Sequence, residues 1–231
     1  MKLRSRSLLV KYQFKSTALR LSPRLYWAMR RWLKGWGEPE LALLPSFADP
    51  ARPAFDIGAH FGLWTAALRP HFSQIHAFEA MPRLAGVLRD GYRGDDHVHV
   101  HDVALSDRNG PAAMRIPIAG LGRGTIEPGN RLQGLKDMSQ PIREISVEPR
   151  QLDAMNLPDP ALIKLDIEGH ELAVLQGGAN MLARARPVLI IEMEDRHAPE
   201  SRARIMKMLS ELGYAALQLP RSRNTIFLPR A

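Results

Sequence analysis

The sequence predicts one α/β domain built around a mostly parallel sheet. Three observations support this: short apolar runs alternate with helical patterns, most runs end at a glycine or a carboxylate, and two closely spaced strands occur only at the end. With 231 residues, 45% of them hydrophobic, the chain is long enough for one such core. Alternating strands and helices favour parallel strands covered on both faces, with a ligand crevice at their carboxyl ends.

Five apolar runs have the length of buried strands, and the segments between them have the spacing of amphipathic helices. The expected strands are residues 54–57, 75–78, 98–103, 161–166 and 188–191, and the expected helices are residues 63–68, 82–90, 172–182 and 205–212. One or two helical turns precede the first strand. Two further strands, 215–219 and 225–228, are joined by a short basic turn and must therefore pair antiparallel.

One long segment interrupts this alternation. Residues 106–145 hold six glycines and several prolines. We expect either a long loop or a small antiparallel excursion from the main sheet. Insertions of this length inside compact domains usually serve as lids or substrate-binding loops.

The formal net charge of +8 belongs to the beginning of the chain. Residues 1–37 carry ten Lys and Arg side chains and no Asp or Glu, whereas residues 38–231 carry 22 basic and 24 acidic side chains. We therefore separate a basic amphipathic N-terminal arm, residues 1–37, from a near-neutral domain, residues 38–231. Within the arm, Ser22-Pro23 is a helix-start signal, and three of the four tryptophans follow it.

Three interpretations of the arm are open: a helix packed on the domain as a lid or dimer contact, contact with an anionic membrane or lipid-linked glycan, or nucleic-acid binding. The first needs only ordinary packing of the tryptophan face, and we do not expect a nucleic-acid partner. No apolar run approaches the roughly 20 residues that span a bilayer. We therefore expect a cytoplasmic protein whose membrane contact, if any, is peripheral and made by residues 1–37 at the inner face.

The chain contains no cysteine. This excludes disulfides, thiolate nucleophiles and zinc sites that use cysteine ligands. Any catalytic base must then come from histidine, a carboxylate or another oxygen or nitrogen group.

The first motif, Asp56-Ile-Gly-Ala-His-Phe-Gly62, falls between the first strand and the first helix. Its glycines are spaced G-x-x-x-G, whereas a dinucleotide pyrophosphate requires G-x-G-x-x-G. The carboxylate of Asp56 opposes a phosphate and suits a ligand with an ammonium group, such as S-adenosylmethionine. Glu79 follows 23 residues later, at a strand end where a carboxylate accepts hydrogen bonds from ribose hydroxyls. The structural alternative is a tight turn followed by a solvated strand end.

The second motif, Lys164-Leu-Asp-Ile-Glu-Gly-His-Glu171, follows the fourth strand. It places four ionisable side chains within six residues, from Asp166 to Glu171. Such a density of titratable groups at a strand end is typical of a reactive site. The structural alternative is a capped helix start, in which Glu171 favours the helix dipole.

The order of DIGAHFG, HAFEA, VALSD, LIKLDIEGHELAVLQGGA and PVLIIE resembles the FkbM family of methyltransferases over roughly residues 38–230. The resemblance implies a Rossmann-like class I methyltransferase fold with a seven-stranded, mostly parallel sheet and a C-terminal antiparallel hairpin. It also implies S-adenosylmethionine as the methyl donor and a hydroxyl oxygen as the acceptor. Acceptors in the family are commonly sugars of glycans, lipopolysaccharide or glycosylated natural products, or macrolide hydroxyls, so we expect a small-molecule or glycan acceptor.

The resemblance also assigns roles to residues. Those that would hold the donor are Asp56, Gly58 and Gly62 at its methionine part, Glu79 at its ribose, and Asp102 to Ala104 at its adenine. Those that would face the reacting centre are Asp166, Glu168, Gly169, His170 and Glu171. His60 departs from the family pattern, which commonly has asparagine there, so the contact of this donor-binding position with the ligand is open.

Methyl transfer from a sulfonium is an in-line displacement, so positioning of the hydroxyl oxygen supplies most of the rate. A sugar hydroxyl is a weak nucleophile, and a general base should help as the proton leaves. His170 is the first candidate, because the reference imidazole pKa of about 6.5 suits proton removal near neutrality. Asp166 and Glu168 come second. The alternative for His170 is a helix-start residue that bonds the backbone.

Two metal sites can be considered. Carboxylates at two neighbouring strand ends suit Mg²⁺, and the candidate ligands are Asp166, Glu168, Glu192 and Glu194. Alternate residues of the third strand share one face, and those histidines are His97, His99 and His101. Three imidazoles suit a transition metal, but a hydrated strand edge is the simpler interpretation.

Three other functions compete with O-methylation. A nucleic-acid methyltransferase would account for the basic arm, but no Asn/Asp-Pro-Pro-aromatic motif follows the fourth strand and no cysteine is present. A nicotinamide-dependent oxidoreductase is disfavoured by the glycine spacing. A non-catalytic binding protein would share the fold, but it would have no need of the titratable groups around Asp166.

Overall fold

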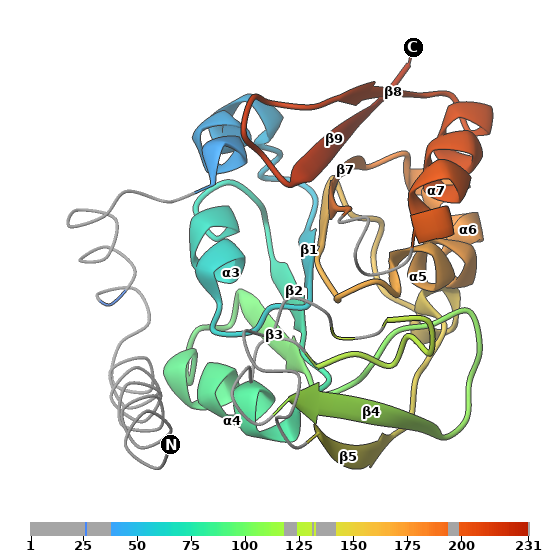
Figure 1. Cartoon of the computed structure of the whole chain (residues 1–231). Helices are drawn as coiled ribbons and strands as arrows, with labels where there is room; N and C mark the ends of the chain where they lie inside the picture. The colour runs from blue at the N-terminus through green and yellow to red at the C-terminus, as the bar shows by residue number, and fades with distance from the viewer. Residues whose placement is uncertain are drawn as a thin grey trace.

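The computed structural model has a seven-stranded sheet at its centre (Figure 1). The strand order is β3-β2-β1-β6-β7-β9-β8, in which β9 is antiparallel to both of its neighbours and all other pairs are parallel. This confirms the expected mostly parallel sheet with a C-terminal antiparallel hairpin. The structure describes residues 26, 38–117, 124–130, 132, 142–193 and 199–230.

The elements of the main sheet alternate along the chain as the sequence predicts. The strands are β1 (Ala54–Ile57), β2 (Ile75–Phe78), β3 (Val98–His101), β6 (Leu162–Leu165), β7 (Val188–Glu192), β8 (Tyr214–Leu217) and β9 (Asn224–Pro229). The helices are α3 (Leu63–Leu68), α4 (Pro82–Gly91), α5 (Glu171–Gly177), α6 (Ala179–Ala185) and α7 (Pro199–Glu211), with 3-10 helices η1 (Pro39–Phe47) and η2 (Leu152–Met155).

Helices cover the sheet on both faces. Figure 1 shows η1 and α3 on one side and α5, α6 and α7 on the other. In β1, Phe55 and Ile57 pack into the core under α5–α7, whereas Ala54 packs against Trp64 and Leu68 of α3. Because β1 and β6 are buried along their whole length, their sequences are nearly continuous apolar runs rather than alternating ones.

The helix expected over residues 172–182 is divided into α5 and α6 at Gly178. A Cβ atom on Gly177 would lie 2.0 Å from the carbonyl oxygen of Ser106, so the end of α5 presses against the backbone after β3. Two successive glycines permit this approach and also weaken the helix at that point.

The segment from 106 to 145 contains a second, two-stranded antiparallel sheet, formed by β4 (Ala112–Pro117) and β5 (Ile142–Val147). Of the two expected alternatives, the antiparallel excursion is therefore the observed one. Met114 and Ile116 of β4 pack with Leu84 and Val87 of α4. We call residues 106–147 the insertion; its described residues between the two strands are 124–130 and 132.

The N-terminal arm lies outside the described residues except for Tyr26, so its expected helix and tryptophan face stay predictions. Within the part of the chain that the structure describes, no helix is both long enough and apolar enough to cross a membrane.

Candidate active site

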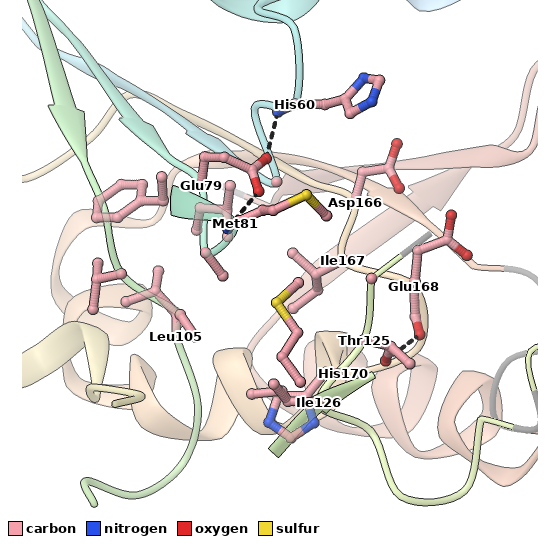
Figure 2. A pocket seen from close by; sticks show the side chains of 18 of the residues that line it. His60, Glu79, Met81, Leu105, Thr125, Ile126, Asp166, Ile167, Glu168 and His170 are labelled. Atoms are coloured by element: carbon pink, nitrogen blue, oxygen red, sulfur yellow. Dashed lines mark hydrogen bonds between the residues drawn. The ribbon is translucent and has the colours of Figure 1, made fainter. Parts of the chain in front are cut away.

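A cavity opens at the carboxyl ends of β1, β2, β3 and β6 (Figure 2). The empty space within it, including the part open to solvent at its mouth, is about 620 Å³. Predicted site residues that line it are Gly58, His60, Glu79, Ala104, Asp166, Glu168 and His170. Apolar side chains complete the lining, among them Met81, Leu84, Leu105, Met114, Ile126 and Ile167.

The loop after β1 is shaped by residues with positive φ. Gly58 has φ 86°, and a Cβ atom there would lie 1.9 Å from the carbonyl oxygen of Asp166. His60 is also left-handed, with φ 50°. Gly62, with φ 77°, begins α3 and faces Leu88 rather than the cavity. Gly58 therefore shapes the cavity floor directly, whereas Gly62 sets the packing of α3.

Glu79 is buried at the end of β2, and both of its carboxylate oxygens accept backbone hydrogen bonds (Figure 2). The N–H of His60 donates to Oε2 and the N–H of Met81 donates to Oε1, each over 2.8 Å. Burial raises the pKa of Glu79 to about 7, against the lowering effect of these two bonds. Each oxygen keeps a lone pair with which it can accept a ligand hydroxyl.

The histidine that replaces the usual asparagine at position 60 leaves this bond in place, because it comes from the backbone. The His60 ring lines the cavity and packs edge-on against Phe61, with 4.4 Å between ring centroids. What the ring itself contacts in a complex stays a prediction.

Asp56 does not line the cavity. It lies on the α3 face of β1, where Thr65 Oγ1 donates a hydrogen bond to Oδ2 over 2.5 Å. Burial raises the pKa of this carboxyl to about 6. Asp56 directly precedes the loop, as the motif predicts. Side chains alternate between the two faces of a strand, however, and that of Asp56 points away from the cavity. The geometry thus gives no support to direct contact with the methionine part of a donor.

Asp102 is also outside the cavity lining. It is exposed at the end of β3, and its carboxylate lies 3.6 Å from the guanidinium of Arg89. Ala104 is buried and lines the cavity together with Val103 and Leu105. Of this stretch of chain, the residues that line the cavity are thus 103–105, and all three are apolar.

The β6–α5 loop, residues 166–170, brings two carboxylates to the cavity. Figure 2 shows the side chains of Asp166 and Glu168 on the same side of this loop. Lys164 Nζ lies 3.6 Å from Asp166 Oδ2. Burial alone would raise the pKa of Asp166, but Lys164 and a hydrogen bond with Glu192 outweigh it and hold the pKa below its usual value.

Glu171 supports this loop and does not face the cavity. Its Oε1 accepts hydrogen bonds from the N–H groups of Ile167, over 3.2 Å, and Gly169, over 3.0 Å. The expectation that Glu171 faces the reacting centre therefore finds no support in the cavity lining. From the first residue of α5, its carboxylate accepts from two backbone N–H groups of the loop that precedes the helix.

His170 is buried at the other end of the cavity from His60 (Figure 2). Nδ1 lies 2.9 Å from Glu127 Oε2, and Nε2 lies 2.9 Å from Ser106 Oγ. Both ring nitrogens are therefore engaged by the protein. The contacts at both nitrogens therefore give no support to His170 as the group that takes a proton from an acceptor.

Neither metal alternative finds support in the structure. Across the described ranges, no group of three or more His, Asp or Glu side chains is arranged to hold a metal ion, and Glu194 lies outside those ranges. His97 is exposed, as a hydrated strand edge requires. His99 and His101 do not form a row with His97, because they pack against His76 of β2 instead. Nδ1 of His76 lies 3.0 Å from Nε2 of His101.

With this geometry in hand, the family can be assigned. Residues 56–216 match the family model of the FkbM methyltransferase domain. The chain belongs to the FkbM methyltransferase family. It is 32% identical over 160 residues to the 2-O-methyltransferase NoeI of Sinorhizobium fredii (strain NBRC 101917 / NGR234), an alignment that spans 63% of this chain and 63% of that protein.

A crystal structure of methyltransferase FkbM from Methylobacillus flagellatus KT shares the fold. The TM-score is 0.53 at 18% sequence identity, covering 77% of this chain and 44% of that one. The class I methyltransferase fold is thus confirmed.

This FkbM methyltransferase has site residues that sequence reasoning missed. Lys164 is one of them, and a lysine inside an apolar strand is the signal of a buried charge that needs partners. It is fully buried, and its ammonium lies 5.4 Å from the centre of the Trp64 ring. Ser106 and Glu127 carry no local signal, because they reach His170 across 64 and 43 residues of chain.

Proposed function

We propose that this FkbM methyltransferase transfers the methyl group of S-adenosylmethionine to a hydroxyl, of a sugar in a glycan, lipopolysaccharide or glycosylated natural product. One observation carries the proposal: the buried Glu79 carboxylate, held by the loop that Gly58 shapes, faces a cavity at the carboxyl edge of the sheet. That placement suits an adenosyl ligand, whose two ribose hydroxyls can donate to the carboxylate.

The cavity gives the donor a direction. With the ribose on Glu79, the apolar residues 103–105 and Met81 would border the adenine, and Gly58 and Asp166 would lie next to the methionine part. The carboxylates of the β6–α5 loop would then hold the sulfonium end of the donor. A cation next to carboxylates is favoured in a partly dry site.

The charges of the cavity support a neutral acceptor. Its titratable lining residues are two histidines and three carboxylates, and none of the described lining residues is Lys or Arg. A phosphate acceptor would meet repulsion from Asp166 and Glu168, whereas sugar hydroxyls can donate to them. The 2-O-methyltransferase activity in the name of NoeI agrees with a hydroxyl acceptor. These points favour a sugar over nucleic acid.

Asp166 is the general base in this proposal, in place of His170. The carboxylate is partly exposed in the cavity, and its lowered pKa keeps it ionised at neutral pH. As the acceptor oxygen forms its bond to the methyl carbon, the carbon–sulfur bond breaks and the hydroxyl proton passes to Asp166. The sulfonium becomes a neutral thioether. Glu168 orients the acceptor from the same loop.

Calorimetric titration with S-adenosylhomocysteine and S-adenosylmethionine tests the donor site. We expect micromolar binding by the wild type, at least tenfold weaker binding by Glu79→Ala, and no change in Glu211→Ala, an exposed carboxylate on α7.

A panel of neutral and anionic sugars, with Mg²⁺ or with a chelator, then tests the acceptor. Asp166→Asn should lower turnover more than donor affinity. A folded wild type that binds neither ligand would refute the proposal.

A further inference from the structure

The insertion contacts the β6–α5 loop at two separate points. The carbonyl oxygen of Glu168 accepts hydrogen bonds from Thr125 Oγ1, over 3.0 Å, and from Asn130 Nδ2, over 2.6 Å. Two residues farther along, Nδ1 of His170 meets Glu127 Oε2 at 2.9 Å. Three polar side chains of one short segment are thus committed to the loop that carries Asp166.

The backbone that receives these bonds needs support. Glu168 has φ 58° and Gly169 has φ 104°, so two successive residues lie at positive φ. A residue with a Cβ atom holds such a conformation only when its surroundings enforce it. Glu171 holds the loop from the helix side, through the N–H groups of Ile167 and Gly169. The insertion holds it from the opposite side, through the Glu168 carbonyl.

Glu127 is itself fixed. The N–H of Gly129 donates to Glu127 Oε1 over 3.1 Å, and Arg115 donates to the carbonyl oxygen of Glu127 over 2.6 Å. The hydrogen bond from His170 is the main cause that lowers the pKa of Glu127. An ionised carboxylate only accepts hydrogen bonds, so Nδ1 of His170 must carry a proton.

Ser106 closes the other side of the imidazole. Its Oγ lies 2.9 Å from Nε2 of His170 and 3.0 Å from Oδ1 of Asp107. The hydroxyl has one proton, which it gives either to the ring or to Asp107. His170 is thereby held between the segment that follows β3 and the insertion's central segment, and its ring orientation is determined at both nitrogens.

We propose that Glu127 is a positioning residue for methyl transfer, which acts through His170, and that Thr125 and Asn130 complete the same clamp on the Glu168 carbonyl. The clamp sets the backbone from which the Asp166 and Glu168 side chains reach the cavity. The insertion thereby fixes the place of the two carboxylates relative to its own residues Thr125 and Asn130. The inference rests on the proposed function, since it assigns the clamp to the methyl-transfer end of the cavity.

The first test measures which nitrogen of the His170 imidazole carries the proton. In protein labelled with ¹⁵N-histidine, with the His170 signal assigned from a His170→Gln sample, we expect the Nδ1–H tautomer above pH 7. Glu127→Gln replaces the acceptor by an amide that also donates, so the signal should move toward the Nε2–H tautomer. Glu148→Gln, an exposed carboxylate beyond β5, is the matched control and should leave it unchanged. An unaltered tautomer in folded Glu127→Gln would overturn the inference.

The second test measures how the loss of these contacts changes ligand binding at the site. Affinity for S-adenosylhomocysteine should fall at least fivefold in Glu127→Gln and in Asn130→Asp, with no change in Glu148→Gln. Asn130→Asp keeps the oxygen that accepts from Leu132 but loses the donor to Glu168. A changed tautomer with unchanged affinity in both variants would show a contact without a positioning role, and the proposal would be withdrawn.

Hydrogen exchange of the peptide that spans residues 165–172 separates the two proposals. Loss of the clamp should speed exchange at least fivefold there and leave β1 and β2 unaffected. A wild type that exchanges slowly in this peptide but binds no adenosyl ligand would refute the proposed function while leaving the clamp as a structural contact. Unchanged exchange in Glu127→Gln and in Asn130→Asp would refute the clamp alone.

Discussion

Gly58 and Gly62 belong to one motif but meet different parts of the molecule. A Cβ atom on Gly58 would collide with backbone of the β6–α5 loop, whereas one on Gly62 would meet the end of the Leu88 side chain at 2.8 Å. Backbone yields less readily than a flexible side chain does. The first glycine therefore governs how closely the loops after β1 and β6 approach beneath the cavity, and the second governs how α3 lies on α4.

Gly58→Ala should destabilise the fold by more than about 3 kcal/mol, since it combines positive φ with a backbone collision. Gly86→Ala is the matched control: it lies in α4 with open space around it and should stabilise by about 0.5–1 kcal/mol. Urea unfolding measures both. Wild-type stability in Gly58→Ala would show that the two loops can separate at little cost.

Donor affinity should depend on pH through Glu79. Because burial raises its pKa to about 7, the free site is mostly protonated at pH 6. Ligand hydroxyls favour the ionised form, so binding releases a proton and affinity should fall about tenfold per pH unit below 7. Titration of S-adenosylhomocysteine between pH 5.5 and 8.5 measures this. Glu79→Gln should remove the dependence, and a flat wild-type profile would contradict the argument.

Among the elements, β1, β2 and α3 have the predicted bounds, because the residues of each segment by themselves indicate where it begins and ends. Two features of the site had no such signal. The face on which Asp56 lies depends on where β1 starts relative to its neighbours, which a motif does not record. The bonds from the insertion to Glu168 and His170 join residues 38 and 43 positions apart, so no period in the sequence reports them.

Between β2 and β3, the buried His76 lies against the partly buried His99 and His101, and this cluster should make stability depend on pH. Burial, His101 and His99 lower the pKa of His76 to about 4, whereas the unfolded value is about 6.5. The fold therefore favours neutral His76: its contribution is complete above pH 6.5 and is lost as pH falls toward 4.

Between pH 7.5 and 5 this loss amounts to roughly 2 kcal/mol. Urea unfolding of wild type and His76→Phe at both pH values isolates it, since the raised pKa values of Asp56 and Glu79 act in the opposite direction in both proteins. Equal pH dependence in the two proteins would exclude His76 as the source.

At the scale of the whole molecule, charge is divided unevenly along the chain. Ten basic and no acidic side chains precede residue 38, and the rest of the chain is slightly acidic. The family match begins at residue 56 and therefore does not include this arm. The one described residue of the arm, Tyr26, packs against the apolar cluster that contains Met81 and Met114 of the cavity lining.

If the arm binds anionic lipid, the full chain should sediment with phosphatidylserine vesicles at low salt, and a chain that starts at residue 38 should stay in the supernatant. Each basic residue near such a surface contributes about 1 kcal/mol, and salt screens the attraction. Circular dichroism and the melting temperature check that the shorter chain folds. A full chain that never sediments would exclude the membrane interpretation of the arm.

The position of β9 bears on how the sheet is completed during synthesis. β9 lies between β7 and β8 and is hydrogen-bonded to both, and within the described chain it is the strand partner of β8. On the ribosome, β8 therefore emerges before the strand that will hold it. The six residues of β9 emerge after β8, and their arrival adds two strands at once. Trimming the chain before Asn224 would leave a five-stranded sheet with β7 as its new edge.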